Sequence, residues 1–106
     1  MKQRIVILGS GESGTGAALL AHKMGYEVFV SDAGPIAQKF QDELNQLGIL
    51  FEMNGHTPEL ILNANEVVKS PGIPDKNDLV QAILKLNIPI VSEIEFASRF
   101  TQSIRQ

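Results

Sequence analysis

A short apolar run, residues 5–8, leads directly into a G-x-G-x-x-G turn formed by Gly9, Gly11 and Gly14. A helix-like segment, residues 15–24, follows without a break. A strand, a glycine turn and a helix in this order are the setting in which the motif binds phosphate groups. The alternative interpretation is a tight strand-to-helix turn that binds nothing. Both interpretations predict an α/β domain, and the first also predicts an anion site.

We expect the residues of this turn to have different roles. Gly9 lets the chain turn sharply, Gly11 lets the backbone approach a pyrophosphate, and Gly14 lets the helix pack closely on the strand. The backbone N–H groups of Glu12 and Ser13, together with the Ser13 hydroxyl, would donate to the anion at the positive end of the helix. The Glu12 side chain should point to solvent, because its charge repels phosphate.

The composition narrows the class of protein. A chain of 106 residues is long enough for one domain with its own core. A net charge of −3 and the lack of a basic stripe argue against nucleic acid as a partner. The sequence has no cysteine, which excludes disulfides and thiolate metal sites and fits the cytoplasm. No segment is apolar over a length that would cross a membrane, and we expect no metal site.

The rest of the sequence alternates between strand-like and helix-like segments. We expect strands at Arg4–Leu8, Glu27–Ser31, residues 50–53, Glu66–Lys69 and residues 88–91. We expect helical segments at residues 15–24, 36–47, 58–62 and 78–86, and from Ser92 or Glu93 onward. Strands separated by helices predict a Rossmann-like, three-layer domain, in which helices cover both faces of a five-stranded parallel sheet. The polar, aperiodic residues 101–106 predict the start of a linker.

Two strand ends carry further candidate binding residues. Asp32 follows the second strand, where dehydrogenases place an acid that binds the adenosine ribose. It could equally cap the next loop, because Asp-Ala-Gly-Pro favours a turn, or be a solvated charge. The loop after the fourth strand is stiffened by Pro71, Gly72 and Pro74, and its Ser70 hydroxyl could face an oxyanion. The alternative for this loop is a purely structural role.

Three segments together resemble the Mur ligase family of peptidoglycan synthesis. They are Gly9-Ser-Gly-Glu-Ser-Gly14, Ser70-Pro-Gly-Ile73 and Ser92-Glu-Ile-Glu-Phe96. The chain is most similar to the N-terminal domain of the members that add D-glutamate to UDP-N-acetylmuramoyl-L-alanine. The sister members that add L-alanine have a differently spaced glycine loop and are the second choice. The resemblance extends from the first strand to the helix after the fifth.

The resemblance implies a three-domain ligase. In such enzymes the first domain holds the UDP group, the central domain binds ATP and magnesium, and the last domain brings the amino acid. It implies that residues 1–100 are a Rossmann-like UDP-binding domain and that residues 101–106 begin a linker to an ATP-binding domain. No lysine of this chain stands in a Gly-x-x-Gly-Lys-Thr loop. We therefore expect no cofactor on this chain and no catalytic residue or ligase activity from its 106 residues alone.

The resemblance also implies the binding residues for UDP-N-acetylmuramoyl-L-alanine. They are Gly9, Gly11, Glu12, Ser13 and Gly14 at the pyrophosphate, Asp32 and Ala33 near the uracil, and Ser70, Pro71 and Gly72 over the sugar. Some relatives carry Thr-Arg after the strand-two acid and hold the uracil with those side chains. Ala33 and Gly34 cannot do so, and contacts to the base must come from the backbone, from Asp32 or from elsewhere.

Two other classes of protein stay open at this point. The glycine motif and Asp32 also suit a NAD-binding regulatory or dehydrogenase domain, and a non-enzymatic, oligomeric nucleotide sensor is the third possibility. Outside the site, we expect His56 to be a solvated or capping residue rather than a metal ligand. Glu93 should cap the last helix, because its charge suits the first helical turn. Met24 is expected in the core, and Phe96 should pack the last helix on the sheet.

Overall fold

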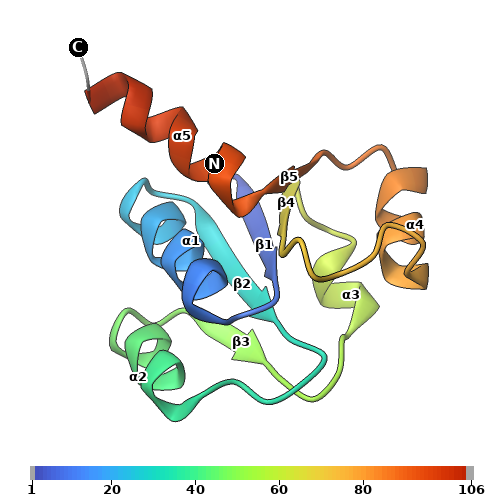
Figure 1. The fold of residues 1–106 in the computed structure, drawn as a ribbon, viewed down its shortest axis with the longest axis horizontal. Coiled ribbons are helices and arrows are strands. Elements are labelled where there is room, and N and C mark those ends of the chain that lie inside the picture. Colours follow the sequence, from blue (N-terminus) through green and yellow to red (C-terminus); the bar gives the residue numbers. More distant parts are fainter. Residues whose placement is uncertain (1, 105–106) are drawn as a thin grey trace.

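The computed structural model describes residues 2–104 of the chain, with side chains as far as residue 100. The strands are β1 (Arg4–Leu8), β2 (Glu27–Ser31), β3 (Leu50–Glu52), β4 (Glu66–Lys69) and β5 (Ile90–Ser92). The helices are α1 (Glu12–Lys23), α2 (Gln38–Gln46), α3 (Pro58–Ile61), α4 (Asp78–Lys85) and α5 (Glu93–Ile104). Each strand is followed by a helix, as the sequence predicts (Figure 1).

All four strand pairings are parallel, and the order across the sheet is β3-β2-β1-β4-β5. The central strand β1 pairs on both sides, with Ile7 opposite Val30 of β2 and Val68 of β4. The chain first builds outward from β1 through β2 to β3, and then returns to the other side of β1 as β4. In sheets of this kind, ligands bind beyond the carboxyl ends of the strands where this reversal occurs.

Alternate side chains of β1 point to opposite faces of the sheet and pack into two separate hydrophobic cores. Because both faces are buried, the strand is apolar throughout. Ile5 and Ile7 pack with α1, α2 and Phe96 of α5, whereas Val6 and Leu8 pack with residues of α3 and α4. Helices thus cover both faces of the sheet, α1, α2 and α5 on one and α3 and α4 on the other (Figure 1). The predicted fold class is confirmed.

Some predicted boundaries were wrong. Helix α1 begins at Glu12 rather than at residue 15, because its first turn is fixed by packing around Gly14 and not by helix-forming residues. Helix α5 continues to Ile104, and residues 101–104 are helical where an aperiodic segment was expected. That residues 101–106 begin a linker stays a prediction. Met24 is 42% exposed, because it follows the last buried turn of α1.

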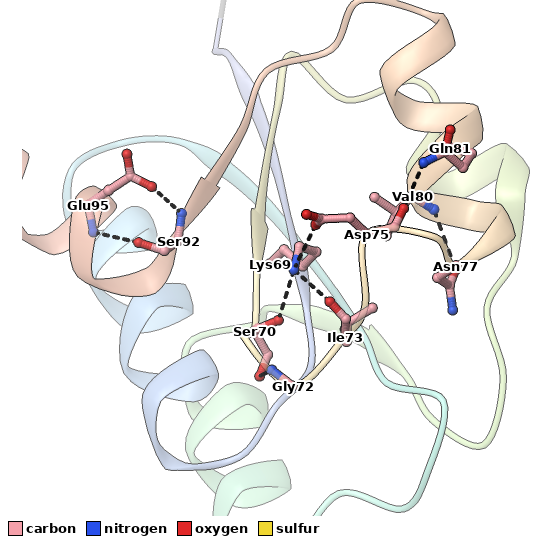
Figure 2. A network of polar contacts seen from close by, with 10 residues as sticks. All are labelled: Lys69, Ser70, Gly72, Ile73, Asp75, Asn77, Val80, Gln81, Ser92 and Glu95. Atoms are coloured by element: carbon pink, nitrogen blue, oxygen red, sulfur yellow. Dashed lines mark hydrogen bonds and ion pairs between the residues drawn. The ribbon is translucent and has the colours of Figure 1, made fainter.

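Helix α5 is fixed at its start by a reciprocal pair of hydrogen bonds (Figure 2). The Ser92 hydroxyl accepts from the backbone N–H of Glu95, and the Glu95 carboxylate accepts from the backbone N–H of Ser92. This is a capping box. The capping carboxylate is therefore that of Glu95 and not that of Glu93, whose pKa is raised by burial.

The body of α5 is held on the sheet by an aromatic group and an ion pair. Phe96 is fully buried, as predicted, and its ring lies 6.1 Å from that of Tyr26 and 5.2 Å from that of Phe100. The Arg99 guanidinium donates to both carboxylate oxygens of Glu66 at 3.1 and 2.7 Å. Over residues 2–104, no helix has the length and hydropathy needed to cross a membrane.

Candidate functional site

A pocket of about 340 Å³ opens at the carboxyl ends of β1, β2 and β4. The residues that directly follow each of these strands line the pocket. The lining residues are Gly9, Ser10, Gly11, Asp32, Ala33, His56, Ser70, Gly72, Ile73, Pro74 and Asn77. Because β1 and β4 are neighbours and the connections reverse between them, the pocket lies where the topology predicts a ligand site.

Two glycines of the turn after β1 are required by the fold itself. Gly9 has a φ of +93°, a conformation that side chains rarely adopt, and its N–H donates to the carbonyl of Ser31 at 2.9 Å. A Cβ added to Gly14 would lie 1.9 Å from the carbonyl oxygen of Gly9. Gly14 therefore allows α1 to pack against the turn, as the sequence analysis predicts.

Gly11 is different, because the fold does not need it. A Cβ added there would have no other atom within 4 Å, and its φ of −80° suits any residue. The space beside Gly11 is open and belongs to the pocket. A ligand can therefore approach the backbone at this glycine.

The start of α1 presents unused hydrogen-bond donors. Its N-cap, Gly11, has no side chain, and the first backbone bond of the helix runs from Thr15 N–H to the Gly11 carbonyl. In the part of the chain that the structure describes, the N–H groups of Glu12, Ser13 and Gly14 meet no acceptor. Free N–H groups and the positive end of the helix dipole favour an anion at this place.

The Asp32 carboxylate links the two loops that border the pocket. Its Oδ2 accepts from the N–H of Ser10 at 2.8 Å, and its Oδ1 accepts from the N–H of Gly34 at 2.9 Å. Ser10 is buried and its hydroxyl bonds that of Thr15 at 2.8 Å. Of the roles considered for Asp32, loop capping is the one that these contacts show.

The loop after β4 is held from within by a lysine (Figure 2). The Lys69 ammonium donates to the carbonyl of Ile73 at 2.6 Å and lies 3.6 Å from the Asp75 carboxylate. The Lys69 side chain is only 14% exposed, whereas that of Asp75 is 86% exposed. Lys69 thus braces the loop that carries Ser70 and Gly72, in addition to the stiffness that its prolines provide.

A polar network borders the pocket at the ends of β2 and β3. The Glu52 carboxylate accepts from the hydroxyl of Ser31 at 2.8 Å and from the N–H and hydroxyl of Thr57 at 2.7 and 2.6 Å. Ser31 Oγ also lies 2.6 Å from His56 Nδ1. Burial raises the pKa of Glu52, but these hydrogen bonds and the nearby imidazole lower that pKa more, and the net shift is downward. His56 is therefore bonded and half-buried rather than solvated.

The structure brings together part of the predicted site. The predicted residues that line the pocket are Gly9, Gly11, Asp32, Ala33, Ser70 and Gly72. Gly14 is buried beneath the turn, and the remaining three are exposed and border neighbouring hollows. Glu12 faces the hollow between α1 and α2, Ser13 that beside α5, and Pro71 that beside β5.

Sequence reasoning missed several residues of this pocket. They are Ser10, His56, Ile73, Pro74 and Asn77. His56 could have been found, because it follows the third strand and parallel strands end at the same edge of a sheet. Asn77 was hidden by its structural role, since its side chain caps α4 by accepting from the N–H groups of Leu79 and Val80. Among the residues that the structure describes, no three histidine or acidic side chains are placed to hold a metal ion.

Several curated ligases are similar in sequence to this chain. The UDP-N-acetylmuramoylalanine–D-glutamate ligase of Porphyromonas gingivalis (strain W83) is 52% identical over 103 residues. The match takes in 97% of this chain and 23% of that relative. The ligase of the same name from Cytophaga hutchinsonii is 54% identical over 99 residues, with coverage of 93% and 22%. The chain thus spans less than a quarter of the length of these relatives.

Solved structures show the same fold. A murein peptide ligase from Psychrobacter arcticus superimposes with a TM-score of 0.82 at 27% identity, over 92% of this chain and 20% of that one. The UDP-N-acetylmuramate–alanine ligase of Thermotoga maritima gives a TM-score of 0.80 at 20% identity, over 94% and 23%. The family model described as Mur ligase MurD-like, N-terminal domain, matches residues 3–92. The chain therefore belongs to the family of MurD-like N-terminal domains of Mur ligases.

Proposed function

We propose that this chain is the substrate-binding domain of a cytoplasmic ligase that joins D-glutamate to UDP-N-acetylmuramoyl-L-alanine. The observation that carries the proposal is the pocket at the reversal point of the sheet, together with the open space at Gly11 and the free N–H groups at the start of α1, which follows Gly11 directly. The family to which the chain belongs supports the identity of the ligand.

In this proposal the diphosphate lies against the start of α1. The N–H groups of Glu12 and Ser13 donate to its oxygens, and the helix dipole offsets part of its negative charge. Among the described residues that line the pocket there is no lysine or arginine. Backbone donors and the helix end therefore carry the interaction. Ser70 and Gly72, on the loop braced by Lys69, would close over the sugar.

The task of this domain is to hold the substrate in place while its distant carboxyl group reacts. In the complete ligase, ATP with magnesium supplies the phosphoryl group that activates this carboxyl group for attack by the amine of D-glutamate. We assign both to the central domain that follows in full-length members of the family. The 106 residues alone should therefore release no phosphate from ATP in the presence of D-glutamate and the UDP-sugar.

A NAD-binding role is less well supported. In dehydrogenases the acid after the second strand binds the adenosine ribose. Here both oxygens of Asp32 already accept backbone N–H groups from the adjoining loops. The MurD-like family match also does not favour a dehydrogenase.

Thermal unfolding with each ligand tests the proposal. A ligand at 100 times its Kd stabilises a one-site protein by about 2.7 kcal/mol, which corresponds to roughly 10 °C or more for a domain of this size. UDP-N-acetylmuramoyl-L-alanine should raise the unfolding midpoint, and NAD at the same concentration should not. Stabilisation by NAD but not by the UDP-sugar would overturn the proposal.

A further inference from the structure

The wall of the pocket between the ends of β2 and β3 has few groups that can recognise a nucleobase. Ala33 offers no polar side-chain atom, and the Asp32 oxygens are already bonded to the N–H groups of Ser10 and Gly34. His56 lines the same pocket. It has one ring nitrogen, Nδ1, bonded to Ser31, while Nε2 has no hydrogen-bond partner among the described residues.

The network behind His56 determines which ring nitrogen carries the proton. Ser31 has one hydroxyl hydrogen, and it donates this hydrogen to the Glu52 carboxylate. Ser31 Oγ must therefore act as the acceptor in its 2.6 Å contact with His56, and Nδ1 must be the donor. In the neutral imidazole only one nitrogen is protonated. Nε2 is then an unprotonated acceptor.

Glu52 is well placed to keep this arrangement. Its carboxylate accepts from Ser31 and twice from Thr57, all within 2.8 Å. These bonds favour the ionised carboxylate, which can only accept and so fixes the direction of the Ser31 hydroxyl. The acceptor at His56 Nε2 is thus set by a network of side chains behind it.

We propose that His56 Nε2 accepts a hydrogen bond from the N3–H group of the uracil base and so selects uridine over cytidine nucleotides. This inference rests on the proposed function, because it requires a pyrimidine nucleotide in this pocket. Uracil carries a hydrogen on N3, whereas the N3 of cytosine is an acceptor. A fixed acceptor at Nε2 therefore gains a bond with uracil and faces a second lone pair with cytosine.

Calorimetry at pH 8 tests this proposal by measuring the affinity of the chain for UDP, dUDP, CDP and inorganic pyrophosphate. The test variant is His56→Asn, whose amide nitrogen can still donate to Ser31 but which has no atom in place of Nε2. The matched control is His22→Asn, which changes an exposed histidine on α1.

Loss of one such hydrogen bond should cost about tenfold in affinity. We expect the wild type and His22→Asn to bind UDP and dUDP about tenfold more tightly than CDP. In His56→Asn, UDP binding should weaken about tenfold, pyrophosphate binding should not change, and the preference over CDP should disappear. A folded His56→Asn protein that keeps the wild-type preference would contradict the proposal. So would equal affinities of the wild type for UDP and CDP.

A second measurement uses the wild type alone, in case His56→Asn does not fold. The ¹⁵N resonances of the imidazole show which ring nitrogen carries the proton. Nε2 should be unprotonated, and UDP but not pyrophosphate should shift its resonance. A protonated Nε2 in the neutral ring, or a resonance that UDP leaves unchanged, would refute the assignment of His56. Failure of the wild type to bind any uridine nucleotide would instead refute the proposed function, and this inference with it.

Discussion

The backbone N–H of Ser10 donates to the Asp32 carboxylate at 2.8 Å, which ties the glycine turn after β1 to the loop after β2. The other oxygen of the same carboxylate accepts from Gly34 in its own loop. One side chain thus holds two walls of the pocket at a fixed distance. These two hydrogen bonds give Asp32, at the end of β2, a structural role that does not depend on a ligand.

Asp32→Asn should lower both stability and ligand affinity. The amide replaces one acceptor oxygen with an NH₂ group, which then faces a backbone N–H. A hydrogen bond to a charged group contributes about 1.5–3 kcal/mol, and we expect a loss of this order in the free energy of unfolding by urea. Asp42→Asn, on the exposed side of α2, is the control and should change stability by less than about 0.5 kcal/mol. Equal stability of the two variants would contradict the clamp role of Asp32.

Substitution by alanine should have opposite effects on stability at two glycines of α1, Gly14 and Gly16. Gly14→Ala should destabilise the domain by roughly 3 kcal/mol or more, because its Cβ would overlap the Gly9 carbonyl. Gly16→Ala should be neutral or stabilising by up to about 1 kcal/mol, because the position is helical and open. Urea unfolding of both variants provides the comparison. A stable Gly14→Ala protein would show that the turn does not pack as described.

Gly11→Val separates binding from folding. A Cβ at this position has no other atom within 4 Å, and the rest of the side chain would occupy the open space where the diphosphate is proposed to lie. We expect a modestly lower unfolding midpoint without ligand, because valine is a poorer N-cap than glycine, and the loss of the midpoint increase that UDP-N-acetylmuramoyl-L-alanine causes. An undiminished increase in this variant would place the diphosphate elsewhere.

Lys69→Met should loosen the loop after β4. Methionine has no donor for the Ile73 carbonyl, and the loss of this bond should cost about 1–3 kcal/mol. Asp75→Asn should cost less than about 1 kcal/mol, because its ion pair with Lys69 is long and Asp75 is exposed. Hydrogen exchange of residues 70–76 would report the change directly. Faster exchange in Asp75→Asn than in Lys69→Met would contradict the bracing role of the lysine.

Glu52 should make stability depend on pH in the acid range. Its pKa is lowered in the folded state, so its contribution is fully present above the pKa of the unfolded chain, about 4.3. The contribution is lost as the pH falls through the lowered, folded-state value. The difference in unfolding free energy between wild type and Glu52→Gln should be constant from pH 6 to 7 and should shrink below about pH 4.3. If this difference in unfolding free energy instead grows as the pH falls, folding raises the pKa of Glu52, and the prediction is wrong.

Much of the fold could be predicted from local patterns. The apolar strand β1, the glycine turn and the alternation of strands and helices are each set by neighbouring residues, and all are confirmed by the structure. The start of α1 was placed too late because Gly14, just before the predicted start, is a poor helix former. Packing of Gly14 on Gly9 fixes this helix start, and such packing leaves no periodic signal in the sequence.

The site was harder to predict, because its residues are joined by contacts between distant segments. Asp32 reaches Ser10, and Ser31 joins His56 to Glu52. None of these pairs has a spacing that identifies it from the sequence. Glu95 was also missed as the capping residue in favour of Glu93, although the Ser-x-x-Glu spacing of a capping box was visible.

The most direct test is an NMR titration of the ¹⁵N-labelled chain with UDP-N-acetylmuramoyl-L-alanine. The account predicts that the largest changes in amide resonances occur at residues 11–14, with further changes at Asp32, Ala33, Ser70 and Gly72. Saturable changes confined to other parts of the domain, with the amides at the start of α1 unaffected, would contradict it.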